Sequence, residues 1–350
     1  MKKTLLNLLK LAVSVTILAV LVHRVLTDDP ETFDNLWDKP KHWGYLAVAW
    51  CAIFTSVVIT IVRWYWLVRA LDMPFSIRDA FRLGFLGYLL NLVSLGSVGG
   101  DFFKAVFIAR EQPGKRTEAV ASIVVDRVLG MLALFIVASG AILLTDLSQF
   151  GPDIVEFGRI TLGFTALLAV GMFVLLLPGW HDSRPMRRLR RLPKVGLLVG
   201  KLVDAVYVYR QRRRVLYLSI VVSMIAHCGN VFAFYCIAQG LPEQAPGLVA
   251  HFIIIPLALV SGAIPLPGGG LGAFEFVTEE LYRLLGAAGL GLLVALTYRA
   301  ITVTIAAIGA VVYLLSRREM SGVIEQAEHL EEQVEEAEQL SMPGEEATLQ

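Results

Sequence analysis

Charged residues and the short motifs of soluble enzymes are scarce in this chain. Asp, Glu, Lys and Arg make up only 17% of its 350 residues, and the formal net charge is +1. This net charge gives no indication of nucleic-acid binding, and we expect no nucleic-acid partner. Three cysteines, an odd number, do not form a disulfide framework. No G-x-x-x-x-G-K-[ST], H-E-x-x-H or C-x-x-C pattern occurs. Such patterns would indicate nucleotide, zinc or redox sites, and we therefore expect no cofactor and no metal.

Hydrophobic residues are abundant instead. They make up 56% of the chain, and the mean hydropathy is +0.65, which predicts an all-α polytopic integral membrane protein. A membrane span needs about 20 apolar residues. The first candidate resembles a signal peptide, but no A-x-A cleavage site follows it, and we interpret it as a retained helix. About six full spans are predicted, at 5–26, 43–68, 118–145, 157–177, 215–238 and 291–315.

The distribution of cations between the spans predicts the orientation. Segment 178–214 carries eleven Lys and Arg residues against two Asp, and cation-rich loops stay in the cytoplasm. The same rule places both termini and segments 69–82 and 110–117 in the cytoplasm. The acid-rich loops 27–42 and 146–156 are predicted to be external. We therefore expect a multi-pass protein of the cytoplasmic membrane.

Two glycine-rich breaks interrupt otherwise apolar sequence, one within 83–108 and one within 249–286. Lipid cannot hydrogen-bond a free backbone, so non-helical chain at membrane depth must be shielded by protein or water. Because the segments on both sides of 83–108 are predicted to be cytoplasmic, 83–108 must enter and leave the membrane on the cytoplasmic side, as a re-entrant hairpin. Segment 249–286 begins and ends outside, and the sequence leaves open whether it forms one hairpin or two full spans.

The two halves resemble each other in reverse orientation. In each, a span is followed by a glycine break and then by a span with an intramembrane arginine, Arg127 or Arg299. Such inverted repeats place a substrate site near the membrane midplane. The competing interpretation is that glycine and proline are simply common in membrane helices. The predicted domains are a transmembrane domain at 1–316, with halves at about 1–177 and 215–316 joined by the basic linker 178–214, and an acidic cytoplasmic tail at 317–350.

Several ionisable residues lie in or beside the apolar segments. A charge at the bilayer centre costs at least about 2.5–3.5 kcal/mol, so such residues are usually paired or line a wet cavity. We interpret Arg127 and Arg299 as ligands for a lipid phosphate, which a guanidinium binds bidentately. Asp101, Asp126 and Glu275 are the predicted proton or charge partners. The alternative is purely structural: an acid neutralises an arginine and fixes two helices together.

The glycine breaks add backbone N–H groups to this predicted substrate site. Its remaining members are Asn91, Gly99, Gly100, Gly268, Gly269 and Gly270. Arg63 and Arg69 alternate with Trp64, Tyr65 and Trp66, which is typical of an interfacial belt with snorkelling arginines.

The motifs together resemble a known family. They are Asn91 with Gly99-Gly100-Asp101, Ala121-Ser122 before Asp126-Arg127, Pro267-Gly268-Gly269 with Gly272 and Glu275, and Arg299. At these residues, and over roughly 10–315, the chain resembles the lysyl-phosphatidylglycerol synthase transmembrane-region family, also described as flippase-like. The resemblance implies an integral membrane protein that moves or presents lipids. In the best-known members this region moves aminoacylated phosphatidylglycerol.

Two departures from that family pattern are visible. Only about 32 residues follow Arg317-Arg318, whereas a catalytic domain needs on the order of 50–100, so we expect no C-terminal synthase domain and no synthase activity. The first break has Gly96-Ser97 where many relatives look proline-bearing, which leaves the shape of that hairpin open.

Three functions are compatible with these patterns. The leading hypothesis is a flippase-like transporter for a phospholipid or a polyprenyl-linked lipid. The second is a membrane glycosyltransferase with a polyprenyl-phosphate donor, for which Asp28-Asp29 in the first external loop would be the acidic pair. The third is a non-transporting scaffold that recruits partners through the basic linker and the acidic tail. The sequence leaves open a partner at that tail and the formation of a homo-oligomer.

Overall fold

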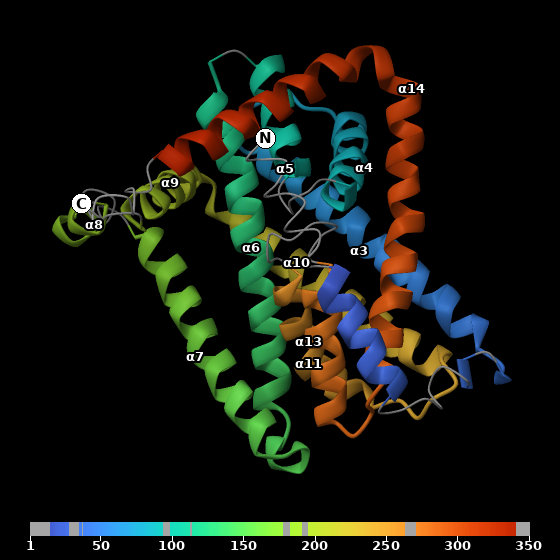
Figure 1. Ribbon diagram of the computed structural model, residues 1–350. Coiled ribbons are helices and arrows are strands. Elements are labelled where there is room, and N and C mark those ends of the chain that lie inside the picture. The colour runs from blue at the N-terminus through green and yellow to red at the C-terminus, as the bar shows by residue number, and fades with distance from the viewer. Residues whose placement is uncertain are drawn as a thin grey trace, which may run out of the picture.

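The computed structural model describes residues 15–27, 35–36, 38–93, 99–112, 114–177, 183–190, 195–262 and 271–340, and the statements below concern these residues. Within them the regular structure is helical and contains no strand (Figure 1). A helix satisfies its own backbone hydrogen bonds, which is what a chain of this composition requires in lipid. The predicted all-α polytopic fold is confirmed.

Five described helices are long and apolar enough to cross a membrane. They match five of the six predicted spans. The first predicted span is described only in part, as the short apolar helix Val15–Thr27. The five are α3 (Trp43–Arg69), α6 (Arg116–Leu143), α7 (Pro152–Leu175), α10 (Arg213–Gly240, preceded by the 3-10 turn η2, Arg210–Arg212) and the Leu290–Leu315 part of α14 (Leu290–Leu340).

The described residues of each glycine-broken segment include two short helices. The first holds α4 (Ile77–Val93) and α5 (Gly99–Glu111), and the second holds α11 (Leu248–Ser261) and α13 (Ala273–Leu284). The two helices of each pair pack on one another. At 1.5 Å per residue they are about 18–26 Å long, shorter than a hydrocarbon core of about 30 Å. The structure therefore favours a hairpin over two full spans for 249–286.

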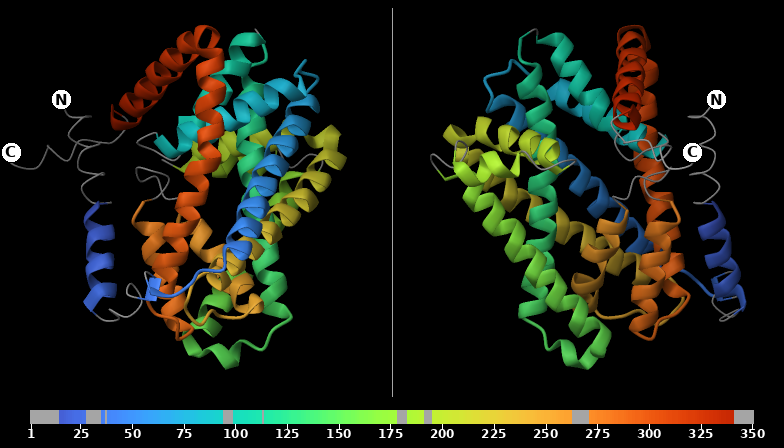
Figure 2. Two further views of the ribbon diagram at one scale, coloured as in Figure 1. Left: turned by 90° about the vertical axis from the view of Figure 1, so that its right-hand side faces the viewer. Right: turned by 60° about the vertical axis from the view of Figure 1, so that its left-hand side comes forward.

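The two hairpins lie in opposite halves of the molecule. In Figure 1, α4 and α5 lie in the upper half and α11 and α13 in the lower half, and Figure 2 shows the same separation from the side. The span after each hairpin contacts both: α6 packs on α5 and α11, and α14 packs on α4, α5 and α13. The element order α3-α4-α5-α6 thus recurs as α10-α11-α13-α14, as expected for an inverted repeat.

The interface between α3 and α10 joins the two halves along their length. A Cβ atom on Gly229 would lie 2.9 Å from Ser56 Oγ, and that hydroxyl donates to the carbonyl oxygen of Ala226 (3.0 Å). Small residues allow such close approach of membrane helices. The two halves are therefore held together by close backbone packing.

Connections predicted to share one membrane face meet in the structure. Lys115 Nζ donates to the carbonyl oxygen of Asp72 (2.8 Å), and Arg212 Nη2 lies 3.0 Å from Asp72 Oδ2. At the other end, Asn35 Nδ2 donates to Glu243 Oε1 (2.8 Å). The predicted grouping of loops is thereby supported, while the assignment of one end to the cytoplasm stays a prediction.

The basic linker and the tail are both helical in their described parts. The linker holds α8 (Arg184–Leu189) and α9 (Val195–Val208), and α9 packs on α6 and α7. Helix α14 continues past its apolar part to Leu340 and turns across one end of the molecule (Figure 1). No helix end therefore marks the predicted tail boundary at residue 316, and the domain division stays a prediction.

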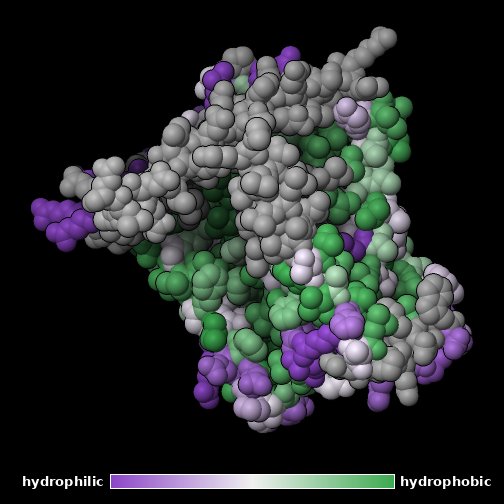
Figure 3. Space-filling view, in the orientation of Figure 1, coloured by the Kyte–Doolittle hydropathy of each residue, from purple (hydrophilic) through white to green (hydrophobic). Residues whose placement is uncertain are grey.

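One face of the molecule is apolar across its middle. Figure 3 shows hydrophobic side chains across the centre of one face and hydrophilic ones at its lower end. On helix α7, for example, Ile160, Leu167 and Phe173 are exposed. An apolar band of this kind marks a membrane-facing surface.

Candidate functional site

The first hairpin carries a buried carboxylate at the start of α5. Asp101 is the third residue of this helix, where the positive end of the helix dipole stabilises a negative charge. Arg127, on α6, donates from Nε to Asp101 Oδ2 at 2.5 Å. Asp101 is 10% exposed at its side chain, whereas Arg127 is 57% exposed. The Arg127 side chain is therefore partly accessible while its Nε is held by Asp101.

The second hairpin repeats the arrangement. Glu275 is the third residue of α13, and Arg299 on α14 donates from Nε to its Oε1 at 2.5 Å. The other oxygen, Oε2, accepts from the backbone N–H of Gly272 (2.7 Å), whose φ of +89° requires glycine. Glu275 is fully buried and Arg299 is 17% exposed. This acid–arginine pair is therefore largely shielded from solvent, and it is called the closed pair below.

The two pairs occupy equivalent positions in their halves. Each joins the third residue of the hairpin's second helix to an arginine on the following span, 26 residues later in the first half and 24 in the second. Arg127 lies about 16 Å along α6 from its start, and Arg299 about 14 Å along α14. If these helices begin at opposite faces of a core about 30 Å thick, both arginines lie near its midplane.

The predicted site residues of the first break hold the hairpin closed. The backbone N–H of Gly100 donates to Asn91 Oδ1 (2.9 Å). A Cβ atom on Gly100 would lie 2.0 Å from the carbonyl oxygen of Gly87, so α4 and α5 touch through their backbones. Gly99 is the first residue of α5. The corresponding Gly268, Gly269 and Gly270 lie outside the described residues.

Asp126 does not pair with its neighbour Arg127 in the structure. Arg63 Nε donates to Asp126 Oδ1 (2.8 Å), and Arg63 Nη1 donates to Ser223 Oγ (2.6 Å). Arg63 is 4% exposed, so its interpretation as a snorkelling interfacial arginine was wrong. It connects α3, α6 and α10. Arg69, at the end of α3, is exposed as expected for the belt.

One sequence signal indicated that Arg63 is buried. Ser56 and Arg63 are seven residues apart on α3 and share a helix face, and both contact α10. A polar side chain two turns before an arginine is not what a lipid-facing stripe contains.

Lys104 completes the first cluster. Its Nζ lies 3.8 Å from Asp101 Oδ1 and 5.0 Å from the ring centroid of Trp64. Arg299 also lies near an aromatic ring: its guanidinium is 5.8 Å from the ring centroid of Phe274.

Other buried polar groups near the second hairpin have structural partners. Glu279 accepts from the backbone N–H groups of Gly289 (2.7 Å) and Leu292 (2.8 Å), at the start of α14. His251 Nε2 lies 2.8 Å from the hydroxyl of Tyr282. Among the described residues no group of three His, Cys, Asp or Glu could hold a metal ion.

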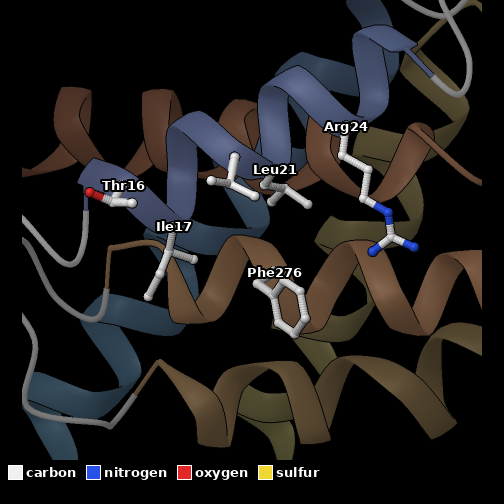
Figure 4. Close-up of a pocket in the computed structure, with 6 residues that line it drawn as sticks. Thr16, Ile17, Leu21, Arg24 and Phe276 are labelled. Carbon is white, nitrogen blue, oxygen red and sulfur yellow. The ribbon is translucent and has the colours of Figure 1, made fainter.

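A cavity of about 260 Å³ lies elsewhere, between the helix Val15–Thr27 and α13. Figure 4 shows Ile17 and Leu21 over Phe276, with Arg24 at one end. Arg24 Nη1 is 2.6 Å from Glu280 Oε1. None of the predicted site residues lines this cavity, so it is distinct from the arginine pairs.

Comparison with known proteins gives one finding. A family model described as the lysylphosphatidylglycerol synthase TM region matches residues 7–309. No curated protein matches the chain. The matched range includes both hairpins and both arginine pairs.

Proposed function

The chain belongs to the lysylphosphatidylglycerol synthase TM region family, and from this premise we propose that it is a flippase-like transporter. It would move a phospholipid or a polyprenyl-linked lipid across the cytoplasmic membrane, with the lipid phosphate as the recognised group. The observation that carries this proposal is the repetition of one acid–arginine pair in two hairpins that lie in opposite halves of the molecule.

Of the two arginines, Arg127 is the better placed to bind a lipid phosphate. Its Nε is held by Asp101, so the guanidinium is oriented while its terminal N–H groups point away from that bond. An oriented guanidinium binds phosphate without losing much side-chain freedom. A lipid phosphate could therefore add to this pair without breaking it.

Movement of the lipid would then require the closed pair to open. Because α6 and α14 each contact both hairpins, a shift of one half against the other changes the surroundings of both pairs. Alternating access by rocking of two repeats is how inverted-repeat transporters work. Asp101, Asp126 and Glu275 are the candidate proton carriers of such a cycle.

The test is lipid translocation in proteoliposomes with head-group-labelled phospholipids and an impermeant quencher. Wild type should expose inner-leaflet label, and Arg127→Gln and Arg299→Gln should each reduce the rate to that of empty liposomes. Arg69→Gln is the matched control, since Arg69 is an exposed arginine outside both pairs, and it should transport normally.

Transport by folded Arg127→Gln and Arg299→Gln variants at the wild-type rate would contradict the site. Absence of translocation with every phospholipid and polyprenyl-phosphate probe would favour the glycosyltransferase hypothesis. Its residues Asp28 and Asp29 lie outside the described residues and would be tested next, as Asp28→Asn and Asp29→Asn. Deletion of the acidic tail, proposed as a partner-binding segment, tests the scaffold hypothesis.

A further inference from the structure

The cavity between the helix Val15–Thr27 and α13 is apolar along most of its length and charged at one end. Its volume is about 260 Å³, and it is lined by six residues, Thr16, Ile17, Val20, Leu21, Arg24 and Phe276. Of these six only Arg24 is ionisable, and Figure 4 shows it at one end of the row of lining side chains. A ligand that fits this lining has a long apolar part and one charged group.

The position of the cavity matches one leaflet of a membrane. Thr16 and Arg24 are eight residues apart, which is about 12 Å along a helix, and half of a hydrocarbon core is about 15 Å thick. Loop 27–42 is predicted to be external, so Arg24 lies toward the external surface and Thr16 toward the midplane. The charged end is therefore at the level of the lipid head groups, and the apolar part is at the level of the acyl chains.

The cavity opens onto the apolar surface of the molecule. Val20 and Phe276 are 61% and 43% exposed, while Leu21 is buried beside Leu292 of α14. In a membrane such exposed apolar side chains contact lipid. Sites for whole drug-sized ligands have volumes of about 300–1,000 Å³, so this smaller cavity admits part of one acyl chain and not a whole lipid.

Helix α13 orients the charged end. Arg24 Nη1 lies 2.6 Å from Glu280 Oε1, and Glu280 also pairs with Arg283. Phe276 and Glu280 are four residues apart and share one face of α13. Arg24 keeps 41% of its side chain exposed. Its guanidinium is therefore held in place and still reaches the surface.

We propose that this cavity binds one phospholipid of the external leaflet, with an acyl chain along Ile17, Leu21 and Phe276 and the phosphate at Arg24. A guanidinium and a phosphate form strong charge-assisted hydrogen bonds. The site is separate from the two acid–arginine pairs, and lipid binding there does not depend on transport.

The test is photolabelling of the purified full-length protein in neutral detergent. The probe is a phosphatidylcholine with a diazirine in the middle of one acyl chain, and the labelled peptides are mapped by mass spectrometry. Labelling of residues 15–27 and of α13 should saturate, whereas labelling of the exposed face of α7 should rise in proportion to the probe. Proportional labelling at both places would overturn the proposal, because it would show only the lipid that surrounds any membrane protein.

Unlabelled competitors test the role of the phosphate. Phosphatidylcholine and a diacylglycerol with identical chains differ in the phosphate head group. Phosphatidylcholine should displace the probe at an about tenfold lower concentration, as expected for hydrogen bonds between charged groups. Equal displacement by the two competitors would overturn the placement of a phosphate at Arg24.

A substitution that fills the cavity tests its occupant. Val20→Trp should abolish the saturable labelling of α13. The matched control is Val170→Trp on α7, since Val170 is 60% exposed and lies outside the cavity, and it should leave that labelling unchanged. Saturable labelling retained in folded Val20→Trp would contradict the proposed site.

A second pair of variants tests the charged end. Arg24→Gln should raise the probe concentration for half-maximal labelling about threefold to tenfold. Arg283→Gln also removes a partner of Glu280, but Arg283 does not line the cavity, so the concentration should not change. An equal shift in both variants, or no shift in Arg24→Gln, would contradict the contact between Arg24 and the phosphate.

Other occupants give different results. A dimer in light scattering that Val20→Trp dissociates, without saturable labelling, would assign the cavity to a second copy of the chain and overturn the proposal. Absence of saturable labelling in a monomer would also overturn it. Arg127→Gln should leave the labelling unchanged, and a loss of labelling in this variant would contradict a site separate from the proposed transport path.

Discussion

Each of the two hairpins supplies the acid of an acid–arginine pair, and the two pairs lie in different surroundings. In the first, Arg127 is largely exposed and belongs to a charged cluster. In the second, Glu275 is fully buried and Arg299 packs near Phe274. Equivalent positions thus provide one open and one closed copy. The pairing is thus the same in the two halves while the exposure of the paired side chains differs, and this difference can be measured.

The largest expected effect is a difference in stability between variants of the two acids, Glu275 and Asp101. Glu275→Gln leaves Arg299 buried without its partner, which should lower the free energy of unfolding by about 3–5 kcal/mol. Asp101→Asn should cost less, about 1–2 kcal/mol, because water reaches Arg127. Thermal unfolding in detergent, followed by tryptophan fluorescence, measures both. Equal losses of unfolding free energy in the two variants would contradict the difference in burial between the two pairs.

A second substitution disrupts only the first hairpin. In Gly100→Ala the new Cβ would lie 2.0 Å from the carbonyl oxygen of Gly87, and such overpacking costs about 1–3 kcal/mol. Gly163→Ala on α7 is the control, since a Cβ there meets no atom within 4 Å. We expect the same unfolding assay to show a loss for Gly100→Ala and almost none for Gly163→Ala. A tolerated Gly100→Ala would contradict the close contact of α4 and α5.

A third, smaller effect tests how Arg63 supports the first cluster. Ser223→Ala removes one acceptor of Arg63 and keeps its bond to Asp126. The loss should be about 1 kcal/mol, the usual contribution of one hydrogen bond. Val221→Ala on the same helix, where Val221 is exposed, is the matched truncation. A larger loss for Val221→Ala would argue against the Arg63–Ser223 contact.

The smallest effect is expected at the predicted cytoplasmic end. Asp72 adopts a φ of +54°, which Asn tolerates well, and its ion pair with Arg212 is exposed. Asp72→Asn should change the unfolding free energy by about 0–1 kcal/mol. A loss as large as that of Asp101→Asn would contradict the small contribution expected for this exposed ion pair.

The sequence predicted the elements better than their contacts. Apolar length located the spans, and glycine placed the breaks between α4 and α5 and between α11 and α13, because both features act locally. Which charged residue pairs with which is not decided by neighbouring residues in the sequence. Asp126 and Arg127 are adjacent, but successive residues differ by about 100° around a helix. Asp126 therefore meets Arg63 of α3, and Arg127 meets Asp101 of α5.

Burial of charge left only one signal in the sequence, the serine Ser56 two turns before Arg63 on the same helix face. Glu279 accepts two N–H groups at the start of α14, a contact that depends on how α13 approaches the next span. Arg63 is buried because α10 lies against that face of α3. Both features depend on the packing of helices distant in sequence, which a single sequence with only intrahelical periodicity does not specify.

We propose that both acid–arginine pairs are needed to move a lipid across the membrane. The most direct measurement is the initial rate of phospholipid translocation in proteoliposomes by wild type, Arg127→Gln, Arg299→Gln and the double variant, each checked for folding. We predict that either single substitution reduces the rate to that of empty liposomes and that the double variant is no slower. A folded single variant that retains half or more of the wild-type rate would contradict the claim.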